Sequence, residues 1–123
     1  MEDGEYKFLL DLFVENQNIG EYAFRGYDGL KSITIGSGVE IIGRNAFELC
    51  INVKKVVLSE GLKRIEYHSL NCVNPRVIVL PSTLEFVDFF AITASKYVIL
   101  SSHSMDDWDE EWHYGGDTFA IIE

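Results

Sequence analysis

Cysteine, proline and long apolar runs are all scarce in this sequence. Its 123 residues include two cysteines and two prolines, too few for a disulfide-dense scaffold, and no CxxC or paired His/Cys spacing indicates a metal centre. No apolar run approaches the ~20 residues that cross a bilayer, so membrane insertion is not expected. Because no Ser/Gly/Pro-rich linker divides the chain, we expect one domain over residues 1–123.

Catalytic motifs are absent as well. The three histidines, His68, His103 and His113, have no Gly-x-Ser-x-Gly or His-Glu-x-x-His motif beside them, and each is expected at the surface. Gly36–Gly38 lacks the lysine and the helix of a phosphate-binding loop. The sequence therefore favours a protein that is not an enzyme and that holds no cofactor.

Basic residues are scarce towards the end of the chain. The formal net charge is −10, and residues 103–123 carry seven acids and no Lys or Arg, whereas residues 1–102 contribute only −3. This balance does not suit nucleic acid or an anionic membrane. The acidic end is either a solvated face or a site for a basic partner, and it lacks the residue spacing of a calcium loop.

A repeat of about 23 residues organises the rest of the sequence. The block Ile19–Phe24 returns as Ile42–Phe47, and it returns in degraded form as Ile65–Leu70 and Val87–Ile92. Such a period predicts a solenoid, in which each coil buries its apolar edge only against its neighbours. Phe24, Phe47, Leu70 and Ile92 should stack as a buried column.

Short β-branched runs fall between these blocks. They are Ser32–Ile35, Lys55–Leu58, Val77–Leu80 and Tyr97–Leu100, and turn residues follow each of them. Alternation sends Ile33 and Ile35, and their counterparts in later coils, to one face. We therefore expect parallel strands, one per coil.

The two ends of the chain are expected to differ from the repeats at 19–100. Leu10 and Leu12 lie 23 residues before Ile33 and Ile35, which predicts a first strand at Lys7–Phe13 inside an N-terminal cap or partial repeat at 1–18. Residues 101–123 are expected to form an acidic C-terminal cap.

Two tryptophans mark this C-terminal cap. Met105, Trp108 and Trp112 have the spacing of one helical face, Ser104 suits a helix N-cap, and Thr118–Ile122 resembles a last strand. The tryptophans either plug the open end of the solenoid or form an aromatic docking site.

Cys50 and Cys72 occupy equivalent stations in successive coils. Adjacent strands lie about 4.8 Å apart, so the two residues form either a ladder of reduced, buried thiols or a disulfide. His68 aligns with Asn45 at a position expected on the coil surface.

The repeated residues resemble the BspA-like leucine-rich repeat family. Ile42–Ile65 follows its pattern with Ile42, Gly43, Ala46, Phe47, Cys50, Val53, Val56, Leu58, Leu62 and Ile65, and the resemblance covers about residues 19–100. Tyr27 and Glu66 depart from the pattern. The resemblance implies a β-rich solenoid, a leucine-rich-repeat array with a terminal Trp-containing segment. It also implies protein–protein interaction, in a surface or adhesin-like setting.

The outer face of the strands is the candidate binding surface. Two outward columns are expected, Asp11–Thr34–Val57–Val79–Ile99 and Leu9–Ser32–Lys55–Val77–Tyr97. Their apolar part gives the candidate partner-binding residues, which are Val57, Val77, Val79, Tyr97 and Ile99. A protein partner, a second copy of the chain in a homo-oligomer, or the C-terminal segment would cover them.

Two functions remain open at this point: an interaction module that uses this face, and a small acidic inhibitor or decoy that binds a basic surface. Met1–Glu5 is acidic, unlike a secretory leader. The chain as written is therefore expected in the cytoplasm, or at the cell surface or outside the cell if it is a trimmed piece of a longer protein.

Overall fold

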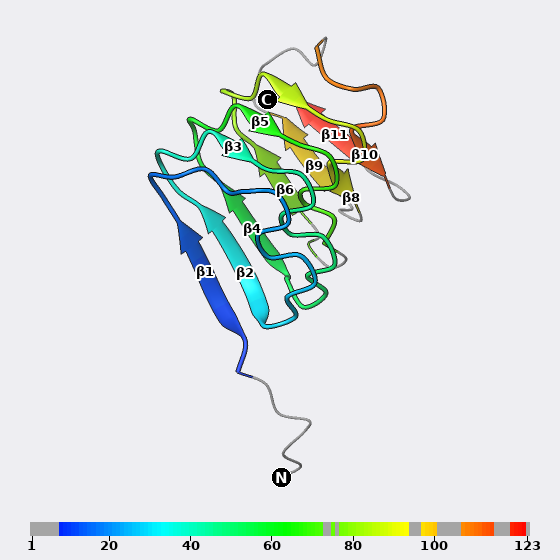
Figure 1. Cartoon of the computed structure of the whole chain (residues 1–123). Helices are drawn as coiled ribbons and strands as arrows, with labels where there is room; N and C mark the ends of the chain where they lie inside the picture. Colours follow the sequence, from blue (N-terminus) through cyan, green and yellow to red (C-terminus); the bar gives the residue numbers. More distant parts are fainter. Residues whose placement is uncertain are drawn as a thin grey trace.

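The computed structural model shows a solenoid of parallel β-strands (Figure 1) and describes residues 8–72, 75, 77–93, 97–100, 107–114 and 119–122. None of these residues lies in a helix. The longer strands are β1 (Leu10–Val14), β2 (Leu30–Ile35), β4 (Lys55–Leu58), β6 (Val77–Leu80), β9 (Tyr97–Leu100) and β11 (Phe119–Ile122). The two-residue strands are β3 (Ile41–Ile42), β5 (Arg64–Ile65), β7 (Phe86–Val87), β8 (Ile92–Thr93) and β10 (His113–Tyr114).

Every strand pairing in the described part of the chain is parallel, as predicted. The longer strands form the ladders β1-β2-β4 and β6-β9-β11, and the shorter ones form β3-β5-β7 and β8-β10. Ser32 pairs with Lys55 and Val77 pairs with Tyr97. Within each ladder a strand pairs with the equivalent strand of the next coil, and β4 lies beside β6. The repeated apolar stations therefore face one shared interior.

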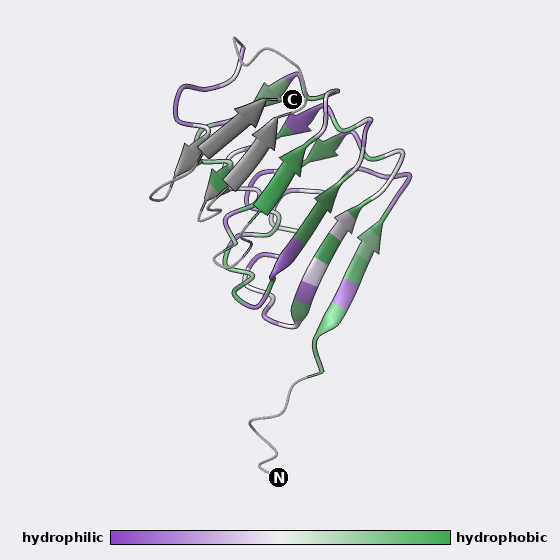
Figure 2. Cartoon of the chain, turned by 180° about the vertical axis from the view of Figure 1, so that it is seen from behind, coloured by the Kyte–Doolittle hydropathy of each residue, from purple (hydrophilic) through white to green (hydrophobic). Residues whose placement is uncertain are grey.

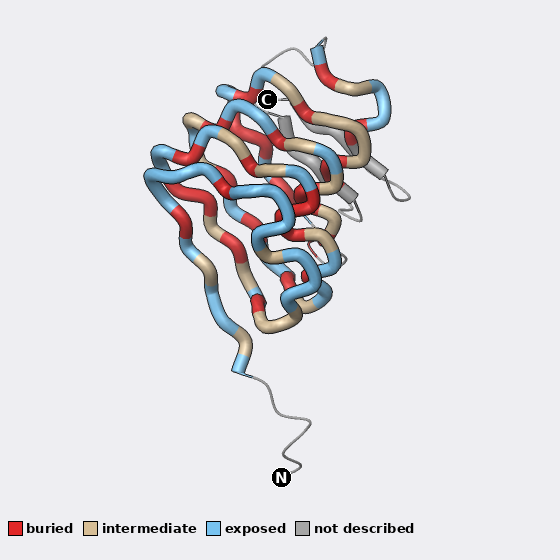
Figure 3. Tube along the Cα trace, viewed as in Figure 1, coloured by how far each residue is buried: buried red, intermediate tan, exposed pale blue. Residues whose placement is uncertain are grey.

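The predicted interior column is confirmed for three of its four residues, and Phe24 is only half-buried. Phe47, Leu70 and Ile92 are at most 1% exposed, and Leu70 bridges to Ile92. The half-buried ring of Phe24 stacks on Phe47 with centroids 5.3 Å apart. Buried and exposed positions alternate along each coil (Figure 3).

The first strand has a different register from the predicted one. β1 begins at Leu10 rather than Lys7, and it pairs Leu12 with Ile33 and Val14 with Ile35. The turn of this coil is two residues shorter, since four residues separate Val14 from Ile19 whereas six separate Ile35 from Ile42. The shorter turn moves β1 by two residues, and Leu10 becomes 52% exposed.

A left-handed residue marks the bend of each coil. Tyr22, Asn45, His68 and Phe90 have φ between 47° and 61°, a conformation that L-residues other than glycine rarely adopt. The residue after the left-handed one is small, and Ala46, Ser69 and Ala91 are each 0% exposed. Ala23, in the first described coil, is exposed.

The predicted helix around the tryptophans is wrong. Residues 107–112 form turns, and the Trp108 and Trp112 rings are buried and meet edge to face with centroids 5.2 Å apart. The two tryptophans are four residues apart, as are the buried coil residues Ile42 and Ala46. The backbone also pairs with the preceding coil, since Ile92 N–H donates to Trp112 C=O at 3.0 Å. The segment therefore continues the coil pattern. Ser104, Met105 and Thr118 lie outside the described residues, and the role of the segment as a cap remains a prediction.

Candidate partner-binding face and a buried carboxylate

Strand alternation places the candidate binding residues on the outer face of the longer strands. Val57, Val77 and Val79 are 38%, 45% and 46% exposed. They alternate with Val56, Leu58, Ile78 and Leu80, which are at most 9% exposed. The structure thus brings the three valines together on β4 and β6, which lie side by side (Figure 1).

Tyr97 and Ile99 follow on the next strand. Their backbones pair with Val77 and Val79, and those of Phe119 and Ile121 pair with them in turn. The side chains of these four residues are outside the described part of the structure. The backbone register therefore extends both outward columns as far as β11.

The two-residue shift of β1 changes the start of both columns. Asp11 pairs with Ser32, not Thr34, and Phe13 pairs with Thr34. Ser32 Oγ donates to Asp11 Oδ1 at 2.6 Å. Phe13, 59% exposed, therefore lies in the column of Val57 and Val79. Sequence reasoning missed this residue because it assumed a constant period.

The face changes character along the solenoid. On β1, β2 and β4 it carries Asp11, Ser32 and Lys55, whereas β6 is hydrophobic throughout (Figure 2). The polar and charged side chains lie towards the first strands of the face. The valines form an apolar part that begins on β4 and continues on β6.

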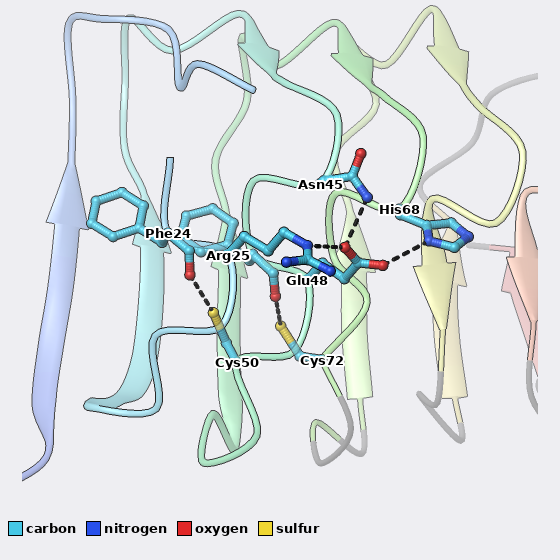
Figure 4. A network of polar contacts seen from close by, with 8 residues as sticks. Phe24, Arg25, Asn45, Glu48, Cys50, His68 and Cys72 are labelled. Carbon is cyan, nitrogen blue, oxygen red and sulfur yellow. Dashed lines mark hydrogen bonds and ion pairs between the residues drawn. The ribbon is translucent and has the colours of Figure 1, made fainter. Parts of the chain in front are cut away.

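A second group of side chains lies at the coil bends, where Glu48 accepts three contacts (Figure 4). Arg25 Nε donates to Glu48 Oε1 at 2.7 Å, and Asn45 Nδ2 donates to the same oxygen at 2.9 Å. His68 Nδ1 lies 3.1 Å from Glu48 Oε2. These four residues come from three successive coils and hold the coils together through charge-assisted bonds.

Burial and hydrogen bonding act in opposite directions on Glu48. Its side chain is 14% exposed, and this burial opposes ionisation. The hydrogen bonds from Arg25, His68 and Asn45 outweigh the burial and lower the pKa of Glu48 below its usual value of 4.5. The carboxylate is therefore charged at neutral pH.

His68 is not the surface residue that was expected. Its side chain is 19% exposed, and its Nε2 is buried without a hydrogen-bond partner. The alignment with Asn45 was correct, since both are left-handed bend residues. The sequence does contain one sign of the contacts around Glu48. Arg25 and Glu48 carry opposite charges and lie 23 residues apart, which is one repeat. The side chains of His103 and His113 lie outside the described residues.

The repeat matches a known protein family. The family described as BspA type leucine-rich repeat region matches residues 10–107 in six copies. This chain belongs to that family. No significant match was found among curated proteins or among solved structures. Membership of the BspA-type family indicates a protein–protein interaction or adhesion-type role.

The BspA-type cysteine station is occupied twice in the described coils. Cys50 and Cys72 are free thiols and are 0% exposed. Cys50 Sγ donates to Phe24 C=O at 3.2 Å and Cys72 Sγ to Phe47 C=O at 3.3 Å. The interaction with Cys50, together with burial, raises the pKa of the Cys72 thiol. Both cysteines therefore act as small interior groups that satisfy carbonyls of the preceding coil.

No group of three His, Cys, Asp or Glu in the described residues is arranged to hold a metal ion. Over the same residues, no helix has the length and apolarity to cross a membrane.

Proposed function

We propose that this BspA-type protein is an interaction module that binds a protein partner through the outer strand face. The partner-binding residues are Val57, Val77, Val79, Tyr97 and Ile99. One observation supports the proposal above others: three valines remain 38–46% exposed side by side, with Lys55 the only charged residue on the outer face of β4 and β6. A rigid strand ladder presents such a face with little ordering cost on binding.

A charge placed in this face tests the proposal. Val79→Lys adds a cation at an exposed position, so it should leave the melting temperature within a few degrees of the parent but weaken partner capture at least about tenfold. Thr34→Lys is the matched control, because Thr34 lies in the same column as Val79 but on β2, which carries none of the proposed partner-binding residues.

Two readouts are required. Affinity capture with the parent, Val79→Lys and Thr34→Lys chains identifies proteins lost only with Val79→Lys, and size-exclusion chromatography with light scattering detects self-association. If Val79→Lys retains both its stability and every association of the parent, the strand face is not the binding surface. If Val79→Lys unfolds the isolated chain instead, the face is covered by the chain itself.

A further inference from the structure

Four parallel rings lie at the bends of two adjacent coils. Tyr67 stacks on His68 with centroids 4.0 Å apart, and Phe89 stacks on Phe90 at 3.9 Å. Between the coils, Tyr67 lies 5.9 Å from Phe89 and His68 lies 5.9 Å from Phe90, with interplanar angles of 6° and 12°. We call these four residues the aromatic ridge.

The bend conformation explains the ridge. Successive side chains of an extended strand point to opposite faces, but His68 and Phe90 are left-handed, with φ of 54° and 47°. The two neighbouring rings of each coil therefore stack on the same side. Tyr67 remains 38% exposed, and Phe89 and Phe90 are only half-buried.

Several acids of the earlier coils are paired with bases, although Glu15 and Glu60 have none within 4.0 Å among the described residues. Glu21, Glu40, Glu48 and Glu66 each have a basic side chain within 4.0 Å. In the described part of the chain, Asp88, Asp109, Glu110 and Glu111 have none. After Arg64 the sequence holds only two more Lys or Arg residues, Arg76 and Lys96.

Three of these acids belong to the second ridge coil or to the coil after it. Phe90 N–H donates to Glu111 C=O at 2.6 Å, so Glu110 and Glu111 occupy the next coil at the ridge position. Both are exposed, and Asp88 directly precedes Phe89. The partly exposed rings of Tyr67 and Phe89, together with carboxylates that have no base within 4.0 Å among the described residues, attract an organic cation.

We propose that the aromatic ridge and its flanking acids Asp88, Glu110 and Glu111 form a second binding surface, which takes an arginine-bearing basic segment of a protein partner. A guanidinium group stacks on an aromatic ring while its N–H groups donate to a carboxylate, and an ammonium group does this less well. The ridge lies at the coil bends, away from the outer strand face, so this proposal does not rest on the proposed function.

The test measures fluorescence anisotropy of a labelled peptide of alternating arginine and glycine against the whole 123-residue chain at about 0.15 M salt, where surface charge is partly screened. The parent should bind this peptide more tightly than the lysine–glycine equivalent and should not bind a glutamate–glycine peptide. Tyr67→Leu with Phe89→Leu should weaken binding about tenfold or more, because both cation–π partners are lost. Tyr67→Phe keeps the ring and should retain the parent affinity.

Matched controls separate a site from general attraction by the net charge. Tyr27→Leu with Phe13→Leu removes two exposed rings from the first coil and should leave the affinity unchanged. Glu110→Gln with Glu111→Gln should weaken binding about tenfold, and Glu15→Gln with Glu21→Gln, which changes the net charge equally, should weaken it far less. Thermal melting of each variant confirms that it is folded.

Three results would overturn the proposal: equal losses for the two Gln pairs, unchanged binding after the ring substitutions, or no binding of the arginine peptide. Val79→Lys should leave peptide binding intact, so failure of the strand-face proposal and failure of this one are distinguishable.

Discussion

Replacing Gly43 by alanine should push two coils apart, whereas the same change at Gly20 should not. The two glycines occupy one position of the repeat, 23 residues apart. A Cβ at Gly43 would lie 2.7 Å from Glu21 N and Ile19 O and 2.8 Å from Gly20 C. A Cβ at Gly20 would meet nothing within 4 Å.

The distances set the size of the effect. Ordinary contact begins at 3.4 Å, so the backbone of one coil must move by about 0.7 Å. The obstructing atoms belong to the backbone and include Ile19 O, which accepts a 2.8 Å hydrogen bond from Gly43 N–H. Overpacking of this kind costs about 1–3 kcal/mol. Gly20→Ala instead removes freedom from the unfolded chain and should stabilise by about 0.4–1 kcal/mol.

Urea unfolding followed by circular dichroism measures both variants against the parent. Gly43→Ala should lower the midpoint and Gly20→Ala should leave it unchanged or raise it, with m-values equal to the parent's if unfolding stays two-state. If both variants shift the midpoint by the same amount in the same direction, the close approach of the coils at Gly43 does not explain the glycine of the repeat.

Two further predictions concern the interior and the bend network. Phe47→Ala should lower the free energy of unfolding by about 3–5 kcal/mol, because it opens a cavity in the middle of the column. Phe24→Ala should lower it less, because Phe24 is only half-buried. A melting temperature of Phe47→Ala within a degree or two of the parent would contradict the column. Because the pKa of Glu48 is lowered in the fold, its carboxylate stabilises the protein above pH 4.5 and loses that contribution as the pH falls through the folded-state pKa. Glu48→Gln should therefore be less stable than the parent at pH 7, and the difference should shrink in acid unfolding curves as the pH falls below 4.5. A difference that is independent of pH would refute this.

The sequence predicted the interior well because every inward position must be apolar in every coil. Phe47, Leu70 and Ile92 recur at one repeat spacing, and no other arrangement buries them together. The register of β1 was wrong for a related reason. Leu10, Leu12 and Val14 are all apolar and alternate, so a slip of two residues leaves the hydrophobic pattern intact. Only the length of the first turn distinguishes the two registers.

Outward positions are harder to predict because packing does not constrain them. The contacts of Glu48 reach residues 20 and 23 positions away, and they depend on side-chain rotamers at the bends rather than on the repeat pattern. The stacking of Tyr67 on His68 depends on a left-handed φ that the residue types do not favour. The period therefore shows which residues of successive coils are neighbours, but not which of them interact.

The charge pairs and the outer strand face both change along the solenoid. Glu21, Glu40, Glu48 and Glu66 lie next to bases, and each pair belongs to the first three coils. Towards the C-terminal end the acids beside the aromatic ridge lack such bases within the described residues, while the outer strand face becomes apolar on β6. Both changes occur in the same coils but on different sides of them.

A partner that covered only the strand face would bury the valines and leave the acids in solvent, so the salt dependence of its binding should be weak. A partner that also reached the ridge would lose affinity as salt is added, and measurement of affinity from 50 mM to 500 mM salt for the parent and for Glu110→Gln with Glu111→Gln separates the two cases.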